Sequence, residues 1–236
     1  MIDLKQHHDS FNDLTQFGQA GVLHKIFNVI GTTNKFFVEF GSDGTESGQG
    51  NSCCLRSLGF DGVLMDGQNR ENSRYKVYQH FITKENINNL FEMYNIPEIF
   101  DFLSIDIDQN DFYVWQNLDK KYRPRVLSIE SNCHFPKDVD SVPPYIPNYT
   151  WNWSGTSGSS AKAIYNLCKI KNYSYVAHCG SDGIYIADEV IKEKKELFKD
   201  INNFDEIFPG PIFNLLNPPE QNLSSKDLLK SNENFS

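Results

Sequence analysis

Short runs of apolar residues alternate along the chain with segments whose apolar residues recur every three or four positions. The first pattern is typical of buried strands and the second of amphipathic helices. The apolar runs predict strands at residues 36–40, 61–65, 80–83, 101–107, 125–129, 173–177 and 184–187. The helical spacing predicts helices at residues 22–30, 51–58, 71–78, 86–94, 111–118 and 159–171.

The alternation of strands and helices predicts an α/β fold, because a helix between two strands makes the crossover that parallel strands need. A tight turn over Gly180–Gly183 joins the last two strands, which predicts an antiparallel hairpin and makes the sheet mixed. We expect one domain over residues 1–195. It includes a helical lead at 1–35 and an aromatic insertion at about 134–156.

The composition of the chain changes beyond this domain. Residues 196–236 are rich in Asn, Pro and Lys, and prolines interrupt regular elements there. These prolines are Pro209, Pro211, Pro218 and Pro219. We expect a tail or a lid without regular elements, and a loose end or an oligomer contact is compatible with the same composition.

Charge and composition exclude several classes of partner. The 236 residues include 22 Lys and Arg against 31 Asp and Glu, a net charge of −9. We expect no nucleic-acid or membrane partner, because phosphates and anionic lipids require a basic surface and no run approaches the roughly 20 apolar residues that span a bilayer. The polar start lacks the apolar segment of a signal peptide, so we expect a cytoplasmic protein. Five cysteines without a C-x-x-C pair argue against disulfides or structural zinc.

Acidic residues end or follow four of the predicted strands: Glu39, Asp66, Asp106 and Glu130. In an open parallel sheet, ligands bind at the carboxyl ends of the strands. One such residue would be explained by a helix cap or by exposure to water, but four on one sheet are hard to explain by packing alone. We therefore expect a ligand site at this edge.

A glycine-rich loop follows the first predicted strand, at Glu39–Thr45. Gly41 and Gly44, with Ser42 between them, allow the backbone to approach a ligand closely. The loop matches neither the P-loop nor G-x-G-x-x-G, and its carboxylates would repel a pyrophosphate. A cationic or zwitterionic ligand such as S-adenosylmethionine fits better, so we expect Glu39 and these three residues to contact it.

Asp66 follows this loop by about twenty residues, where a carboxylate can accept hydrogen bonds from both hydroxyls of an adenosine ribose. NAD would use the same geometry, so Asp66 indicates a nucleoside without deciding which one. Thr83 and Asn86 would lie near the adenine, although ordinary turn chemistry explains them equally well.

Four stretches resemble class I S-adenosylmethionine-dependent methyltransferases of the FkbM type: Gln16–Gly18, Phe37–Gly41, Ser104–Asp111 and Ile129–Asn132. The likeness covers about residues 14–190. It implies a Rossmann-like, mostly parallel seven-stranded sheet with a closing antiparallel hairpin and helices on both faces. It also implies that Gln16 contacts the cofactor.

Asp106 and Asp108 are two residues apart, so on a continuing strand their side chains would face the same way. With Glu130 and Asn132 they offer oxygen ligands for a hard cation, Mg²⁺. The arrangement is similar to catechol O-methyltransferase and to metal-dependent sugar O-methyltransferases. That likeness implies Asp106, Glu130 and Asn132 as ligands and Asp108 as the general base. Without a metal, Asp106 would bind the amino group of the methionine moiety and Asp111 would cap its helix.

A hydroxyl acceptor must lose its proton, which makes Asp108, Asp111 and His134 the catalytic candidates. An exposed loop histidine is the alternative interpretation of His134. The insertion carries aromatic side chains whose flat faces suit a sugar ring, and a loop packed by its own aromatics explains them equally well. They are Tyr145, Tyr149, Trp151 and Trp153.

Together these features predict an S-adenosylmethionine-dependent O-methyltransferase, with or without Mg²⁺. We expect a small carbohydrate acceptor, a sugar hydroxyl of a nucleotide-linked or surface-glycan precursor in polysaccharide biosynthesis. A carboxylate or phosphate-like oxygen is an alternative acceptor. A nucleotide-sugar or NAD-linked enzyme and a non-catalytic cofactor-binding homologue are rival hypotheses, the latter because Gln109 and Cys133–His134 depart from the family's pattern. A homo-oligomer is compatible with the sequence.

Overall fold

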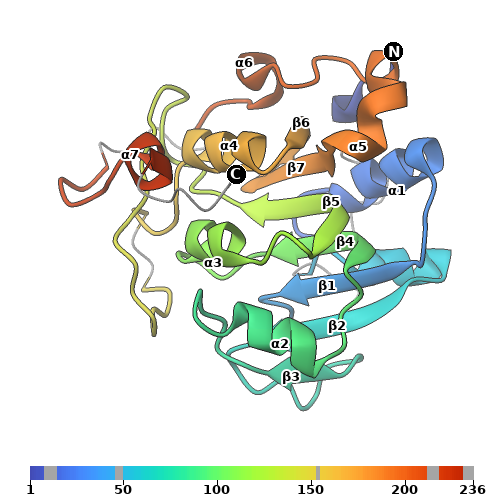
Figure 1. Ribbon diagram of the computed structural model, residues 1–236, viewed down its shortest axis with the longest axis horizontal. Coiled ribbons are helices and arrows are strands. Elements are labelled where there is room, and N and C mark those ends of the chain that lie inside the picture. The colour runs from blue at the N-terminus through green and yellow to red at the C-terminus, as the bar shows by residue number, and fades with distance from the viewer. Residues whose placement is uncertain (8–14, 46–49, 153–154, 212–217, 231–236) are drawn as a thin grey trace.

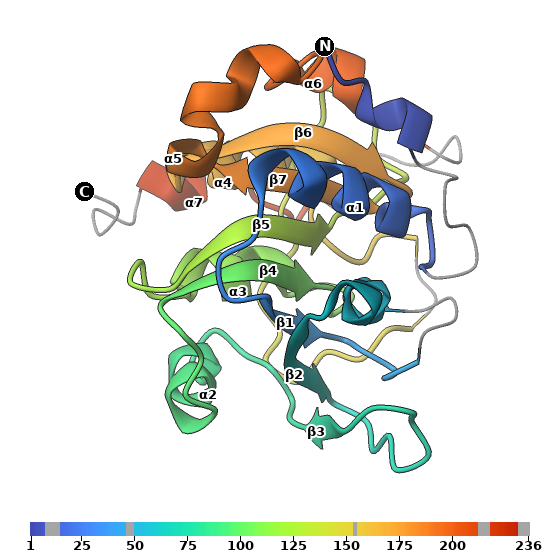
Figure 2. The ribbon, with the colours of Figure 1, turned by 90° about the vertical axis from the view of Figure 1, so that its right-hand side faces the viewer.

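The computed structural model describes residues 1–7, 15–45, 50–152, 155–211 and 218–230, and these form a seven-stranded sheet. The strands lie in the order β3-β2-β1-β4-β5-β7-β6 (Figures 1 and 2). Their bounds are β1 Phe36–Phe40, β2 Asp61–Asp66, β3 Val77–Gln79, β4 Ile99–Ile105, β5 Arg123–Glu130, β6 Tyr173–Cys179 and β7 Asp182–Ala187. The expected α/β fold with a mixed, mostly parallel sheet is confirmed.

The strands β1 to β5 pair in parallel, and β7 is antiparallel to both β5 and β6. The carboxyl ends of the parallel strands therefore share one edge, toward which the arrowheads of β1 and β5 point in Figure 1. Ile105 of β4 pairs with Phe40 of β1 and with Ile129 of β5. Asp106 and Glu130 are the next residues after Ile105 and Ile129, so they lie at neighbouring positions on this edge.

Helices cover both faces of the sheet, as the sequence predicts (Figures 1 and 2). One face packs against α2 (Ile87–Met93), α3 (Asp111–Asn117) and α4 (Ala161–Ile170). The other packs against α1 (Gln19–Ile30) and the 3₁₀ helix η2 (Cys53–Leu58). None of the described helices combines the length and apolar character needed to cross a lipid bilayer.

Two helix ends show how local sequence sets the boundaries. Gly31 ends α1 with a φ of 69°, which glycine adopts without steric cost, and its N–H donates to the carbonyl oxygen of Phe27 at 2.9 Å. Ser160 begins α4, where its Oγ accepts from the N–H of Ala163 at 3.2 Å. Such a cap satisfies a helix N–H that has no intrahelical partner.

The helix expected at 71–78 is wrong. The segment forms turns, and the short strand β3 starts there at Val77, before the strand expected at 80–83. The Oγ of Ser73 lies 2.7 Å from the carbonyl oxygen of Arg70 and 2.6 Å from that of Tyr75. These contacts give the backbone hydrogen bonds that compete with a helix.

The described part of the tail also differs from the expectation, because it contains helices despite its prolines. α6 (Phe204–Ile207) and α7 (Ser225–Lys230) are short, and both Phe204 and Phe208 are buried. Backbone bonds join Ile2 to residues 197 and 199, so the amino-terminal segment lies against this part of the chain. The remaining elements are η1 (Leu4–His7), α5 (Asp188–Ile191) and η3 (Lys192–Leu197).

Candidate functional site

A cleft of about 740 Å³ opens at the carboxyl ends of the parallel strands. Its volume lies within the range of roughly 300–1,000 Å³ that is typical of small-molecule sites. The structure brings eight of the predicted site residues to this cleft. They are Gln16, Gly41, Asp66, Asp106, Asp108, Glu130, Asn132 and His134.

Gly41 forms part of the cleft because β1 and β4 end very close together. Its φ is 78°, and a Cβ at this position would lie 1.7 Å from the carbonyl oxygen of Asp106. Gly44 lies in different surroundings, where an added Cβ would be 2.6 Å from Val77 and 2.7 Å from the Cβ of Ser73. Gly44 therefore packs against the turn before β3 and does not line the cleft.

Glu39 is buried below the glycine loop and does not line the cleft. Its carboxylate accepts from the backbone N–H groups of Asn51 and Ser52, at 2.5 and 3.2 Å, and from the hydroxyl groups of Ser52 and Ser42. Burial raises the pKa of Glu39, and these donors oppose that shift. Glu39 and Ser42 thus hold the backbone after the loop rather than facing the cleft.

Asp66 ends β2 and reaches the cleft while remaining buried. Its Oδ1 accepts from the backbone N–H of Gln68 at 2.6 Å, and its Oδ2 lies 3.2 Å from the Nη2 of Arg70. The tight turn and the ion pair fix the carboxylate at the edge of the sheet. This is the position that the sequence assigns to a ribose partner.

Thr83 and Asn86 do not line the cleft, because they bind each other. The N–H of Thr83 donates to Oδ1 of Asn86 at 2.8 Å, and the N–H of Asn86 donates back to Oγ1 of Thr83 at 3.3 Å. This favours the turn interpretation of both residues. Phe81 lines the cleft instead and lies over Gly67, where an added Cβ would be 3.1 Å from the ring. The sequence analysis missed Phe81.

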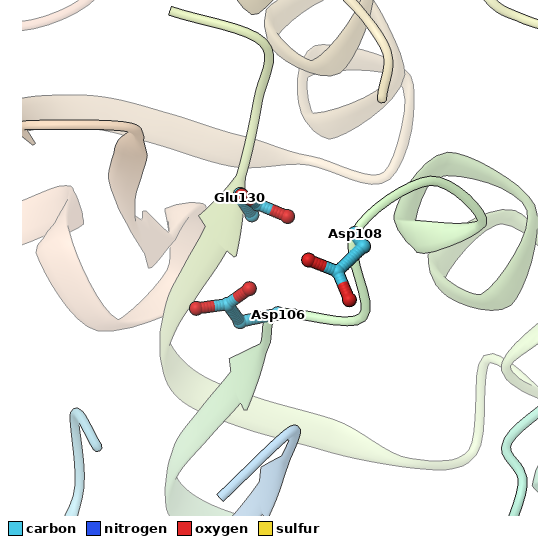
Figure 3. Close-up of side chains that lie close together, drawn as sticks. All are labelled: Asp106, Asp108 and Glu130. Carbon is cyan, nitrogen blue, oxygen red and sulfur yellow. The ribbon is translucent and has the colours of Figure 1, made fainter. Parts of the chain in front are cut away.

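Three carboxylates meet at the centre of the cleft. Asp106, Asp108 and Glu130 each place an oxygen within 4.8 Å of the others, and their side chains face a common space (Figure 3). Burial raises the pKa of Asp106 and Glu130 well above the usual values, and neighbouring negative charges raise them further. Carboxylates that crowd in this way oppose one another's ionisation.

Asp108 reaches this cluster by a route that the sequence does not show. β4 ends at Ile105, two residues before the predicted end, so Asp106 and Asp108 do not lie on a continuing strand. Asp108 instead adopts a left-handed φ of 70° and is exposed. A non-glycine residue in this conformation is strained, and such strain is typical of functional sites.

The three carboxylates fit a divalent cation. Oε2 of Glu130 is buried and has no hydrogen-bond partner among the described residues. An unpartnered buried carboxylate oxygen is costly, and a cation would satisfy it while relieving the repulsion within the cluster. Mg²⁺ prefers such oxygen ligands, so the described cluster suits the expected metal.

Asn132 lines the cleft, but its amide is used elsewhere. Its Nδ2 donates to the carbonyl oxygens of Gly155 and Ser157, at 2.9 and 2.6 Å, and its Oδ1 accepts from the N–H of His134. Since that oxygen already holds the backbone, Asn132 is a poor metal ligand. Asp108 is the third residue of the group that could hold a cation, where the sequence analysis expects Asn132.

Asp111 lies behind the cleft and does not line it. The residue is 1% exposed, and its Oδ1 accepts from the backbone N–H of Ile107 at 2.8 Å. Burial raises the pKa of Asp111 to about 8. The contact closes the turn between β4 and α3, so Asp111 positions Asp108 from behind and is not placed to touch a ligand in the cleft.

The loop between β5 and α4 forms one wall of the cleft. Tyr149 and Trp151 line it, and 48% of Trp151 is exposed. Tyr145 does not line the cleft and bonds Glu85, while Trp153 lies outside the described residues. His134 also lines this wall, and burial lowers its pKa.

The sequence analysis also missed a buried carboxylate, Asp182, at the start of β7. Its Oδ2 accepts from Gln19 at 2.9 Å and from Asn51 at 2.7 Å. Gln19 in turn accepts from the N–H of Phe17, a cleft residue beside Gln16. The side chain of Asp182 points inward because of the hairpin turn. The spacing of apolar residues alone does not reveal this direction.

No family model matches this chain, and no curated protein matches it. The likeness to FkbM-type methyltransferases therefore stays a prediction from the motifs.

Proposed function

We propose that the protein binds S-adenosylmethionine in this cleft and transfers its methyl group to a hydroxyl oxygen of a small carbohydrate acceptor. The observation that carries the proposal is the convergence of Gly41, Asp66 and Asp106 from three strands on one cleft. The strand order, with β7 antiparallel between β5 and β6, is also the arrangement that the resemblance implies.

The donor half of the cleft lies over β1 and β2. Asp66 offers a carboxylate for ribose hydroxyls, and Gly41 leaves room for a ligand to approach the backbone. Phe81 adds an aromatic face beside Asp66. The cleft lining carries four acidic residues, and negative charge favours a cationic donor over a dinucleotide with its pyrophosphate. S-adenosylmethionine supplies an electrophilic methyl group on a sulfonium centre.

The acceptor half lies between the acidic cluster and the aromatic wall. Methyl transfer needs the acceptor oxygen held about 3–3.5 Å from the methyl carbon, so positioning supplies much of the acceleration. Asp108 is the exposed carboxylate of the cluster and is placed to accept the hydroxyl proton. Partial desolvation in the cleft, with the charge of Asp66, raises the pKa of Asp108, which without a cation makes it a stronger base than an ordinary aspartate. With a divalent cation held by Asp106, Asp108 and Glu130, the cation itself would promote loss of the proton by lowering the pKa of the hydroxyl.

Calorimetry with S-adenosylhomocysteine tests the donor site. We expect the parent protein to bind it and Asp66→Asn to bind about tenfold or more weakly, because a hydrogen bond to a charged group contributes roughly 1.5–3 kcal/mol. Asp61→Asn is the matched control, since Asp61 begins the same strand at the opposite edge and pairs on the surface with Arg56. No binding by the parent at millimolar ligand, or equal binding by all three proteins, would refute the proposal.

A further inference from the structure

The charge of the cleft restricts the chemistry of the acceptor. Arg70 is the only Lys or Arg among the described residues that line it, and it is paired with Asp66 in the donor half. Asp106, Asp108 and Glu130 therefore face the acceptor half with no lysine or arginine from the described lining beside them. The residues outside the described ranges include no Lys or Arg at all.

Bound cations would not reverse this balance. Three ionised carboxylates carry three negative charges, so a divalent cation leaves one. A sulfonium donor, whose amino and carboxylate groups cancel, would bring the formal sum to about zero. An anionic acceptor would therefore gain no net attraction from the complete site.

Three backbone N–H groups at the end of β5 are engaged within the protein and are not available to an oxyanion. The backbone N–H of Ser131 donates to Ser181, that of Asn132 to Ser159, and that of His134 to the Asn132 side chain. Both hydrogens of the Asn132 amide bond the carbonyl oxygens of residues 155 and 157. Burial lowers the pKa of His134, which disfavours a positive charge on its ring. Phosphate sites in proteins rely on such N–H groups and on cations. The N–H groups named here are engaged, and no Lys or Arg of the described lining lies beside the acidic cluster.

The opposite wall offers flat aromatic surface instead. Trp151 and Tyr149 line the cleft from the loop before α4, and nearly half of Trp151 is exposed. The C–H face of a sugar ring can bury its apolar area against such side chains, while the ring hydroxyls reach the carboxylates. An uncharged ring gains from both surfaces without desolvating an anion.

We propose that the acceptor is an uncharged saccharide, and that a phosphate, sulfate or carboxylate next to the reacting hydroxyl is rejected. This inference rests on the proposed methyl transfer and narrows it to one class of substrate. The inference excludes the alternative in which the methyl group goes to a carboxylate or phosphate-like oxygen. It also disfavours a sugar whose reacting hydroxyl adjoins a phosphate.

The test uses isotope-labelled S-adenosylmethionine with matched pairs of saccharides, such as methyl hexosides against the corresponding hexose phosphates and hexuronates. We expect label in neutral members at a rate about tenfold or more above their charged partners, because like charges in contact oppose binding strongly. Equal or preferential labelling of the charged members would overturn the inference.

A variant that adds a positive charge shows whether the charge of the cleft, and not its shape, decides which acceptors are rejected. Thr150 lines the cleft and is exposed, so Thr150→Arg places a cation on the acceptor wall. We expect this variant to narrow the ratio between neutral and phosphorylated acceptors, and Thr150→Gln to leave it as in the parent. An unchanged ratio in Thr150→Arg would overturn the electrostatic basis.

Binding of S-adenosylhomocysteine distinguishes failure of this inference from failure of the proposed function. If the parent does not bind it and labels nothing, the methyl-donor site itself is wrong. If the parent binds it but labels no neutral saccharide, the inferred acceptor class is wrong while the donor site stands.

Discussion

Two aspartates five residues apart, one on β4 and one just past it, have opposite surroundings. Asp101, near the amino end, accepts from the backbone N–H groups of Thr33, Asn34 and Lys35 and pairs with Arg125 at 2.6 Å. Asp106, just past the carboxyl end, faces other carboxylates. The fold supplies donors and a cation for the carboxylate of Asp101, whereas the carboxylate of Asp106 has no Lys or Arg partner among the described residues. Burial of a carboxylate alone therefore does not mark a functional site; the chemistry of its neighbours does.

The largest effect should come from Asp101. Asp101→Asn leaves Arg125 without a carboxylate partner, although the Arg125 side chain is only 11% exposed. Loss of one partner of a buried pair costs about 3–5 kcal/mol. We expect urea denaturation to show a loss of this size in the free energy of unfolding. Asp61→Asn, at an exposed ion pair, serves as the control and should change stability by less than about 1 kcal/mol. If the two variants lose equal stability, the buried pair of Asp101 and Arg125 does not stabilise the fold as described.

The same substitution at Asp106 should act in the opposite sense. Asp106→Asn removes one like charge from the cluster, so without metal we expect equal or higher stability, by about 1 kcal/mol. Methyl transfer should fall about a hundredfold or more, because the cluster loses a site for cation and donor. Added Mg²⁺ should raise the Tm of the parent and not of the variant. If Asp106→Asn loses as much stability as Asp101→Asn, the contrast between the two carboxylates is wrong.

The last expected effect is a change in the pH dependence of stability, not in stability at one pH. Burial raises the pKa of Asp111 to about 8 in the folded protein, against 3.8 as its ordinary value. Its contribution to stability is fully present below about pH 4 and is lost as the pH rises through about 8, with a slope of at most about 1.4 kcal/mol per pH unit.

Asp111→Asn keeps an oxygen that can accept from the N–H of Ile107 but cannot ionise. We therefore expect its unfolding free energy to vary less between pH 5 and 8 than that of the parent. Glu196→Gln changes an exposed carboxylate and is the control. Identical pH profiles for the parent and Asp111→Asn would contradict the assignment of the raised pKa to Asp111.

Sequence patterns located the sheet because its central strands are continuous apolar runs such as Phe36–Phe40. They failed before β3, a strand of three residues, where hydrogen bonds of Ser73 decide the backbone. Asp66, Asp106 and Glu130 were found because strand ends in a parallel sheet share an edge. Partners from distant loops were not predictable: the amide of Asn132 is taken by a segment 23 residues later.

The conformation of single residues was equally hidden from pattern analysis. Asp108 joins the cluster through a left-handed φ after β4 has ended, whereas a strand-like alternation was expected. Thr83 and Asn86 have the polar groups to bind an adenine, yet they satisfy each other. Composition states which groups are present, but only three-dimensional contacts show which remain available to a ligand.

Asp182 ties together segments that are far apart along the chain. One of its oxygens accepts from Gln19, at the start of α1, and from Asn51, just after the glycine loop. Neither segment can leave without stripping a buried oxygen of a partner. The two segments should therefore open as one cooperative unit, and their amide hydrogens should exchange with solvent at a common rate.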